Sequence, residues 1–353
     1  MKTFKVAVLA NLKKNAPHWE GMPADQWDDL DSEKTVNALV NAIREGGHTC
    51  EFLEGDLSLP DTLRAYKPDI CFNICEGHFG DAREAQVPSL LEMLQIPYTA
   101  SKVLTLALCL DKPLTKRLLQ YHGLLTPNFQ VFETAEDAID PDLTFPLFVK
   151  PSREGTGMGV SAQSIVRNEK ELREQVKIIN ERYHQGALVE HFVEGREVTL
   201  GMMGNLNRPI SHQSPLEGDP EEVYKGLHFF PPMEVDLDPY LETDAVYSNR
   251  LKVEIPEQIN YLCPAPLEKD QLRQLQLLAG GVFHVTGALD VSRVDFRLDV
   301  HDHYKPYILE INPLPGLTPG ISDIVMEANA EGMSHTELVL NILNHGLKRY
   351  GLM

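Results

Sequence analysis

Near its carboxyl end the chain carries two apolar runs, each typical of a β-strand, that are interrupted by charged and amide side chains. The stretch reads VDFRLDVHDHYKPYILEINPLPG, with Arg293 and Asp295 in the first run and Glu310 and Asn312 in the second. Because the segment between the runs is short and polar, the simplest prediction is an antiparallel hairpin. Alternate side chains of a strand share a face, so all four polar groups can meet on one side.

This set of side chains has two interpretations. Two carboxylates and an amide oxygen form a hard oxygen set, which suits Mg²⁺ better than zinc or copper, and Mg²⁺ commonly shares such sites with substrate phosphates. Arg293 would then stabilise charge that develops on a transferring acyl phosphate or a tetrahedral intermediate. The alternative is a buried ion-pair cluster with a purely structural role.

Composition limits the class of protein. The 353 residues are 42% hydrophobic and 24% charged, which is typical of a soluble globular protein with about two or three compact units. The net charge of −20 would repel a phosphate backbone, so no nucleic-acid partner is expected. No membrane helix is expected either, because the longest apolar run, VLTLALCL, is far shorter than the roughly 20 residues that span a bilayer.

The amino-terminal stretch and the cysteines indicate where in the cell the protein works. The amino terminus, KTFKVAVLANLKK, has too short an apolar centre for a signal peptide and is predicted to be a first strand. The five cysteines are odd in number and mostly have apolar neighbours, which indicates reduced core thiols in a cytoplasmic protein. Cys71 and Cys75 lack a second Cys/His cluster at metal spacing, so the core is favoured over a metal site.

The order of strand and helix signals predicts an α/β (α+β) protein with three domains. Residues 1–111 alternate strands and helices as a Rossmann-like β-α-β-α-β unit with a parallel sheet. Residues 112–196 form a smaller α+β unit, in which VSAQSIV is predicted to be a strand. Residues 197–353 begin with a strand and continue through a long proline-interrupted segment, 209–266, which is typical of a functional lid or binding loop.

Two further features suit a nucleotide. Lys150 ends an apolar strand and precedes a loop with three alternate glycines, which would let backbone amides approach phosphate oxygens. The spacing matches neither a dinucleotide fingerprint nor a P-loop, so a simple mobile hairpin remains an alternative. Glu190 and Glu197, at the ends of neighbouring strands, would read an adenine and a ribose, or would merely be solvated.

Six motifs in order, DKPLTKRLL, FPLFVKPSREGTGMGVS, LVEHFVEGREVT, SRVDFRLD, YILEINPLPGLT and EGMSHTELVLNIL, resemble the ATP-grasp superfamily and, within it, the D-alanine–D-alanine ligase branch. The resemblance implies a three-domain ATP-grasp fold that binds ATP and two Mg²⁺ ions, which Mn²⁺ can replace. It implies a carboxylate–amine ligase that forms an amide or peptide bond through an acyl phosphate. The substrates would be small amino acids or peptides, and the protein would be a homodimer.

The resemblance also implies a role for individual residues. ATP would be held by Lys112, Lys150, Glu190, the backbone of Val193, and Glu197; magnesium by Asp295, Glu310 and Asn312; and the oxyanion by Arg293 and the Gly316 amide. Lys252 would reach the γ-phosphate when the long loop closes. The loops 152–159 and 209–264 are expected to exclude water from the acyl phosphate.

The departures from the family pattern lie on the substrate side. The family's HGxxGEDGxxQG is here EGHFGDAREAQVP, so that Glu76 replaces the histidine and Asp81 falls in the acidic pair. Asp31 or its neighbour Asp29 is the nearest carboxylate to a glutamate of the early loop, Thr156 replaces a serine, and Ser322 is the candidate contact for the second substrate's carboxylate. An ammonium-bearing substrate is therefore expected. Its identity differs from D-alanine, or the differences are drift around that specificity.

Two other functions remain open at this stage. One is a nucleotide-binding sensor or scaffold that no longer ligates, which would bind ATP without amine-dependent phosphate release. The other is a phosphotransferase, which would leave a stable phosphorylated product in place of an amide.

Overall fold

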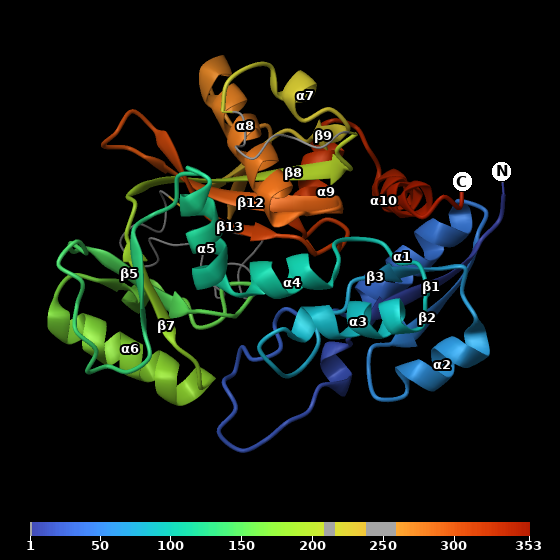
Figure 1. Ribbon diagram of the computed structural model, residues 1–353, viewed down its shortest axis with the longest axis horizontal. Helices are drawn as coiled ribbons and strands as arrows, with labels where there is room; N and C mark the ends of the chain where they lie inside the picture. The colour runs from blue at the N-terminus through green and yellow to red at the C-terminus, as the bar shows by residue number, and fades with distance from the viewer. Residues whose placement is uncertain (1, 208–215, 238–258) are drawn as a thin grey trace.

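The computed structural model describes residues 2–207, 216–237 and 259–353, which form three sheets with helices packed around them (Figure 1). The amino-terminal sheet is parallel, as predicted, and its strands follow the order β2-β1-β3. Its elements are β1 (Lys5–Ala10), η1 (Lys13–Asn15), α1 (Glu33–Glu45), β2 (Thr49–Glu54), α2 (Leu59–Tyr66), β3 (Ile70–Asn73), η2 (Arg83–Ala85) and α3 (Gln86–Met93). Helix α1 begins after Ser32, whose side chain accepts a hydrogen bond from the Thr35 amide, and ends at Gly46.

Two helices lead from this layer into the rest of the molecule. They are α4 (Val103–Leu110), which is the apolar run VLTLALCL, and α5 (Lys112–Tyr121). Asp111 caps α5, with its side chain accepting a hydrogen bond from the Leu114 amide at 2.9 Å. Within the described ranges, no helix is long and apolar enough to cross a membrane.

The middle sheet is antiparallel, with strand order β4-β7-β5-β6, and α6 packs on it. Its elements are β4 (Phe129–Phe132), β5 (Leu147–Pro151), η3 (Ala162–Ser164), β6 (Ile165–Val166), α6 (Glu169–Tyr183) and β7 (Ala187–His191). The prediction of a strand over VSAQSIV is wrong for most of that stretch. Ser161 and Ser164 form a capping box that folds this stretch into a 3-10 turn and leaves only Ile165 and Val166 to pair with β5.

The third sheet follows the order β11-β10-β8-β12-β13, with β9 on the side of β8. Its elements are β8 (Gly195–Gly204), α7 (Pro220–Val223), β9 (Leu227–Phe229), β10 (Met233–Asp236), β11 (Asn260–Leu262), α8 (Lys269–Thr286), β12 (Asp290–Asp299), β13 (Lys305–Asn312), α9 (Asp323–Ala330) and α10 (His335–Arg349). The described parts of the proline-interrupted segment therefore contribute strands to the sheet. Runs of three or four residues are too short for their periodicity to be seen in the sequence.

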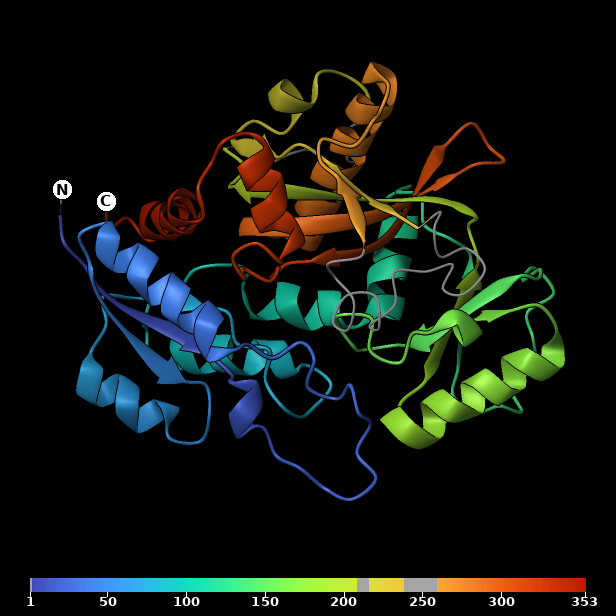
Figure 2. The same cartoon turned by 180° about the vertical axis from the view of Figure 1, so that it is seen from behind.

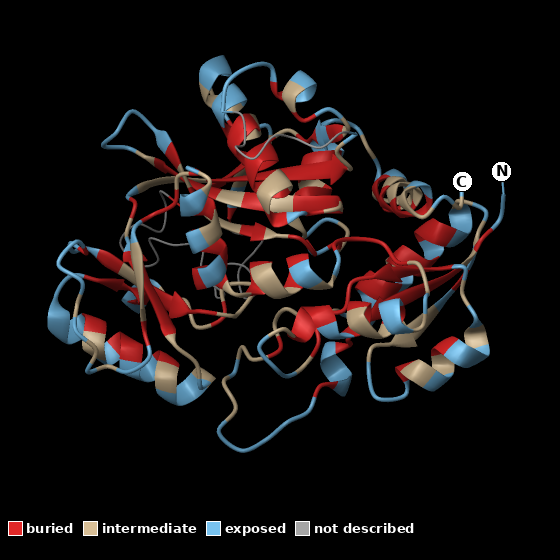
Figure 3. Ribbon diagram, viewed as in Figure 1, coloured by how far each residue is buried: buried red, intermediate tan, exposed pale blue. Residues whose placement is uncertain are grey.

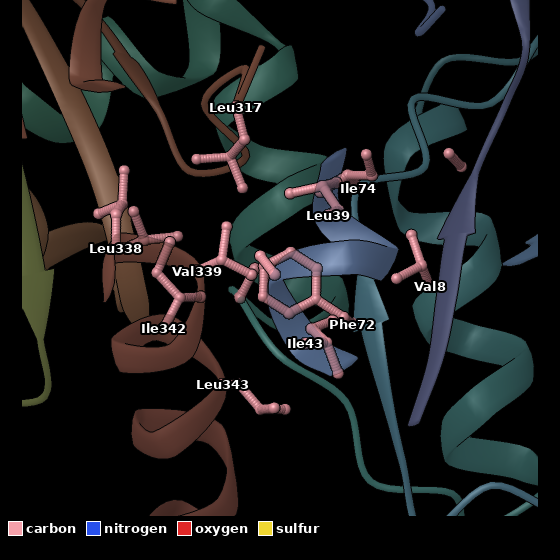
Figure 4. Close-up of a cluster of buried hydrophobic side chains, with 14 of the residues drawn as sticks. Val8, Leu39, Ile43, Phe72, Ile74, Leu317, Leu338, Val339, Ile342 and Leu343 are labelled. Carbon is pink, nitrogen blue, oxygen red and sulfur yellow. The ribbon is translucent and has the colours of Figure 1, made fainter. Parts of the chain in front are cut away.

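The carboxyl-terminal helix returns to the amino-terminal layer, where α10 packs along α1 (Figure 2). Figure 4 shows the core that the two ends of the chain share: Val8, Leu39, Ile43, Phe72, Ile74, Leu317, Leu338, Val339, Ile342 and Leu343. Arg349 at the end of α10 joins this layer to the third sheet, because its Nη2 donates to the Tyr98 carbonyl at 2.8 Å and lies 2.7 Å from Asp290 Oδ2 at the start of β12. Buried residues follow the sheets and the inner faces of the helices, and the middle sheet has a core of its own with α6 (Figure 3).

The cysteines agree with the sequence-based expectation. Cys50, Cys71, Cys75 and Cys109 are buried free thiols and Cys263 is partly buried. Burial raises the pKa of the Cys50 thiol to about 12. These thiols pack as small apolar side chains.

Candidate functional site

The predicted hairpin is confirmed as the antiparallel pair of β12 and β13. Its register places Arg293 opposite Asn312 and Asp295 opposite Glu310. Arg293 Nε donates to Asp295 Oδ1 at 2.8 Å, and Asn312 Nδ2 donates to Asp295 Oδ2 at 3.0 Å. The four polar groups therefore converge on one side of the hairpin, as the alternation of the strands predicted.

The donor set at this hairpin fits a hard divalent cation. Asp295 and Glu310 supply carboxylates. The Asn312 side chain supplies an amide oxygen when its amide group is flipped, which exchanges the positions of its oxygen and nitrogen. Thr199 Oγ1 donates to Asp295 Oδ1 at 2.7 Å and holds that carboxylate in place. The described residues contain no group of three or more Asp, Glu, His or Cys side chains that would enclose a metal. Such a sparse set suits Mg²⁺, which keeps water or phosphate oxygens among its ligands.

The predicted oxyanion residues lie together beside the hairpin. Arg293 Nη1 is 3.0 Å from Asp323 Oδ2 at the start of α9. A Cβ added at Gly316 would lie 3.0 Å from Ser322 Oγ, so the glycine amide and the serine are neighbours. Ser322 Oγ in turn accepts a hydrogen bond from the Thr318 amide at 2.9 Å. Two acidic partners therefore fix the orientation of the guanidinium, and a side chain at position 316 would crowd Ser322.

One cavity between the middle and third sheets brings together the five described residues that were predicted to hold ATP. Its lining includes Lys112, Lys150, Glu190, Val193 and Glu197, together with Asp295 and Glu310. Hereafter it is called the first cavity. Lys112 Nζ lies 3.5 Å from Glu310 Oε2 and donates to the backbone carbonyl of Glu154, so the lysine joins the hairpin to the glycine-rich loop.

A buried charge triad that the sequence reasoning missed supports the floor of the first cavity. Lys116 Nζ lies 2.7 Å from Glu190 Oε2, and Lys150 Nζ lies 2.9 Å from Glu190 Oε1. Lys116 also donates to Thr126 Oγ1 at 2.6 Å. The spacing of Lys112 and Lys116 on α5 was the available signal, because residues four apart share a helix face.

Electrostatics in the triad are set by burial and by the opposed charges. Burial alone would raise the pKa of Glu190, but the ammonium groups of Lys116 and Lys150 outweigh it and hold the pKa at about 2. Burial lowers the pKa of Lys116 to about 8, against the attraction of Glu190. Glu190 is therefore a carboxylate at neutral pH, able to accept a further hydrogen bond from a ligand in the cavity.

The remaining first-cavity residues offer hydrogen-bonding groups at its rim. Among the described residues, no hydrogen bond is formed by the backbone N–H or C=O of Val193, although that residue is only 4% exposed. Glu197 Oε2 lies 3.2 Å from Arg297 Nη2, on the adjacent strand β12. An unpaired backbone edge and a nearby carboxylate are the groups that an adenine and a ribose require.

A second cavity adjoins the first, and Lys112, Glu154 and Glu310 line both. It collects most of the residues predicted to contact substrate or the oxyanion: Asp31, Glu76, Thr156, Arg293, Gly316 and Ser322. Asp81 is not brought to it. The Asp81 side chain is 85% exposed and lies 3.3 Å from Arg153 Nη1, because the turn after Gly80 directs it to solvent. Lys252 lies outside the described residues.

Two buried residues of the substrate side were not foreseen. Arg83 forms an ion pair with Asp29 and lies 3.5 Å from Glu154 Oε2, while Glu84 lines the second cavity. Both follow Asp81 in the altered motif GDAREAQ. The short helix η2 turns them inward, and that local turn was not visible in the sequence pattern.

The early loop, residues 11–32, reaches across to the middle sheet. Asp25 Oδ2 accepts a hydrogen bond from the Gly159 amide at 2.8 Å, and Tyr183 donates to Asp25 Oδ1 at 2.8 Å. Buried Trp27 anchors the loop, with its indole nitrogen donating to the Pro17 carbonyl at 2.8 Å. The loop therefore ties the amino-terminal layer to the glycine-rich loop and to α6.

Comparison with known proteins adds to this geometry. A family model described as "D-ala D-ala ligase C-terminus" matches residues 118–224 and 233–344. A D-alanine–D-alanine ligase of Syntrophotalea carbinolica is 32% identical over 331 residues, covering 94% of this chain and 95% of the relative. An uncharacterised protein of Sinorhizobium fredii is also 32% identical, over 90% of this chain and 88% of its own. The crystal structure of a D-alanine–D-alanine ligase from Bacillus anthracis complexed with ATP superposes with a TM-score of 0.71 at 19% identity, covering 99% of each chain.

Proposed function

The chain belongs to the D-alanine–D-alanine ligase family and is an ATP-dependent ligase with the ATP-grasp fold, and from this premise we propose that it joins a carboxylate to an amine through an acyl phosphate. The observation that carries the proposal is the junction of the two cavities. Lys112 and Glu310 line both, so a phosphate end in the first cavity would lie beside the oxyanion residues of the second. The proposed domains are residues 1–111, 112–196 and 197–353.

In the first cavity, the proposed ligand is ATP. Lys112 and Lys150 would neutralise its phosphates, the backbone of Val193 and the carboxylate of Glu190 would bind the adenine, and Glu197 would bind the ribose hydroxyls. The glycine-rich loop covers this cavity with Gly157 and Met158, which would help to exclude water.

Asp295, Glu310 and Asn312 would hold the magnesium, with Mn²⁺ as a substitute. When bound, the metal supplies positive charge that offsets the charge of the ATP phosphates. Lys252 is proposed to reach the γ-phosphate, and its position is outside the described part of the chain.

In the second cavity, the proposed reaction has two steps. An oxygen of the substrate carboxylate attacks the γ-phosphorus of ATP and ADP leaves, which gives the acyl phosphate. The nitrogen of an uncharged amine then attacks the acyl carbon, loses a proton, and inorganic phosphate departs with the electrons of the broken C–O bond. Arg293 and the Gly316 amide would stabilise the oxyanion of the tetrahedral intermediate, because both line this cavity beside Ser322.

The substrates are proposed to be small amino acids or peptides, and a pair other than two D-alanines. Glu76 and Asp31 in the second cavity support an ammonium-bearing substrate, and Thr156 and Ser322 are proposed contacts as well. Asp81 has no part in this proposal, since it faces solvent. A cytoplasmic homodimer is the proposed working form.

A sensor or scaffold that only binds nucleotide is less favoured. Binding ATP would not require Arg293, which the structure holds by two carboxylates at a site beyond the first cavity. A phosphotransferase would need the same site, and only the product distinguishes it.

The test is phosphate release from Mg-ATP with D-alanine, followed by pools of D- and L-amino acids and dipeptides, with mass spectrometry of the product. Release that needs an amine, together with an amide product, supports the ligase. A D-alanyl-D-alanine product would establish the usual specificity, and a stable phosphorylated acid would replace the ligase by a phosphotransferase.

A further inference from the structure

One wall of the second cavity carries more carboxylates than the neighbouring cations balance. We call it the acidic wall, made of Asp29, Asp31, Glu76 and Glu84. Arg83 is the cation behind it, and it is already engaged by Asp29 and lies 3.5 Å from Glu154. The wall therefore offers more carboxyl groups than Arg83 and one substrate ammonium could pair with.

Three of the four other cations that line this cavity form ion pairs with residues outside the wall. Lys112 faces Glu310, Arg293 is held by Asp295 and Asp323, and Lys13 pairs with Asp28. Lys34 is exposed, and it forms no ion pair within the described residues. Lys112 lowers the pKa of Glu84 through its charge, but within the described residues none of these four cations forms an ion pair with a carboxylate of the wall.

Three of the four carboxylates of the wall have no hydrogen-bond donor in the part of the chain that the structure describes. Glu84 is only 9% exposed, and no side-chain hydrogen bond or ion pair joins it, Glu76 or Asp31 to any other described residue. Asp29 Oδ1 is buried without a partner, although its other oxygen is held by Arg83. Buried carboxylates left in this state are costly, so their presence in a cavity indicates a cationic ligand.

A metal ion is a poor candidate for that ligand. No cluster with the geometry of a metal site is formed by Asp, Glu, His and Cys side chains in residues 2–207, 216–237 and 259–353. An ammonium group places looser demands on the geometry of its partners, because its three N–H groups can donate hydrogen bonds to separate carboxylates.

The titration behaviour of the wall is consistent with this ligand. Burial, followed by the charge of Asp29, raises the pKa of Asp31 to about 7. Burial likewise raises the pKa of Glu84 to about 7 and that of Glu76 well above its ordinary value. Near neutral pH some of these carboxyl groups therefore keep a proton while no ligand is bound, and a bound cation would favour their ionised form.

The cavity also supplies an apolar surface close to the wall. Cys109 and Leu110, at the end of α4, line the cavity, and Cys109 interacts electrostatically with Glu84. An alkyl stem could pack against these side chains while its terminal charge reaches Glu84.

We propose that the amino-acid substrate of this ligase is a diamino acid, whose second ammonium group is bound by Glu76 and Glu84 while Asp29 and Asp31 face its α-ammonium. The proposal rests on the proposed ligase function and adds the substrate class. It explains why the wall contains several carboxylates where one would bind a monoamine.

The experiment uses the full chain with Mg-ATP and measures amine-dependent phosphate release. Diamino acids with side chains of one to four methylenes, as D- and L-isomers, are each compared with an uncharged amino acid of similar length. We expect KM to be lower by about tenfold or more for one diamino acid than for its uncharged counterpart. Equal use of charged and uncharged partners would overturn the substrate class while leaving the ligase function intact.

Two variants locate the effect. Glu84→Gln and Glu76→Gln should raise KM for the diamino acid by about tenfold without changing KM for ATP. Glu51→Gln, on an exposed position of β2 that lines neither cavity, is the matched control and should change neither. An unchanged preference in both wall variants would also contradict the proposal.

Direct binding separates the two proposals. Calorimetry with the same diamino acids, without ATP, should give saturable binding that weakens in Glu84→Gln. If no substrate pool supports ligation, the ligase proposal fails. Saturable binding of a diamino acid would in that case still support the acidic wall as the binding site for two ammonium groups. Absence of binding by every diamino acid in the panel overturns the inference.

Discussion

Lys116 Nζ and Glu190 Oε2 lie 2.7 Å apart in the interior of the molecule, where Lys116 is 1% and Glu190 2% exposed. This contact joins α5 to β7 and fixes the carboxylate that faces the first cavity. A residue with no predicted role thus positions one that is proposed to bind adenine.

Removal of the Lys116 charge should therefore affect both stability and nucleotide affinity. Lys116→Met leaves Glu190 with Lys150 alone and is expected to lower the free energy of unfolding by about 3–5 kcal/mol, since one partner of a buried pair is lost. KM for ATP should rise as Glu190 shifts. Chemical denaturation and steady-state kinetics measure the two effects.

The control is an exposed pair of the same type. Lys177 Nζ lies 3.7 Å from Glu181 Oε1 on α6, and both side chains are about two-thirds exposed, at 65% and 66%. Lys177→Met should change stability by less than about 1 kcal/mol. If the two variants unfold at the same denaturant concentration, the buried pair does not have the importance argued here.

The acidic wall predicts a stability that depends on pH. The pKa of Glu84 is raised from 4.5 to about 7, so between these values the folded protein holds a proton that the unfolded chain releases. Stability must then fall as pH rises through this range. Glu84→Gln removes the loss, and the ligand-free variant should be more stable than wild type at pH 8 by about 1–3 kcal/mol, with little difference at pH 4.

Denaturation of both proteins at pH 4 and pH 8 tests this expectation. Glu51→Gln, which is exposed, should follow wild type at both values. A difference between Glu84→Gln and wild type that stays constant with pH would mean that the carboxyl is not titrating as described.

The geometry of the β12–β13 hairpin predicts that turnover depends on the carboxylate of Glu310. Glu310→Gln keeps the shape of the side chain but loses a charge beside Lys112, and kcat is expected to fall by about 10²–10³ while the fold is retained. A chelator should remove the activity of the wild-type protein, and added Mg²⁺ or Mn²⁺ should restore it. Asp302→Asn, in the exposed turn of the same hairpin, is the control and should retain activity.

The contact of Asp25 with the glycine-rich loop predicts a role in excluding water. Asp25→Ala removes both the Gly159 and the Tyr183 hydrogen bonds, so the ratio of phosphate released to amide formed should rise by about twofold or more as the acyl phosphate is hydrolysed. Tyr183→Phe removes one of the two and should have a smaller effect. A ratio that stays at one in Asp25→Ala would exclude this role.

The sequence predicted the hairpin because its signal is local: two runs, a short polar turn and alternation fix which side chains meet. The cap of α1 is local as well, because the Ser32 side chain bonds an amide only three residues away. The resemblance supplied Lys150, Glu190 and Val193, and the structure brings these three to one cavity.

What the sequence did not predict depends on contacts between distant segments or on weak local preferences. Lys116 pairs with a residue 74 positions later, and no periodicity reports such a pair. The position of Asp81 was inferred from the family's motif, but the chain there turns differently and places Glu84 in the cavity instead. VSAQSIV has the composition of a strand, but the side chains of Ser161 and Ser164 form hydrogen bonds with backbone amides and stabilise a turn instead.

The return of α10 to the amino-terminal layer has a consequence for the synthesis of the protein. Leu338, Val339, Ile342 and Leu343 complete a core that Val8, Leu39 and Phe72 begin. While the chain emerges from the ribosome, the strands of the amino-terminal sheet therefore have an apolar face that stays uncovered until residues 335–349 have been made. The core of this layer closes only with α10, and a nascent chain that lacks α10 exposes that face to solvent and to chaperones.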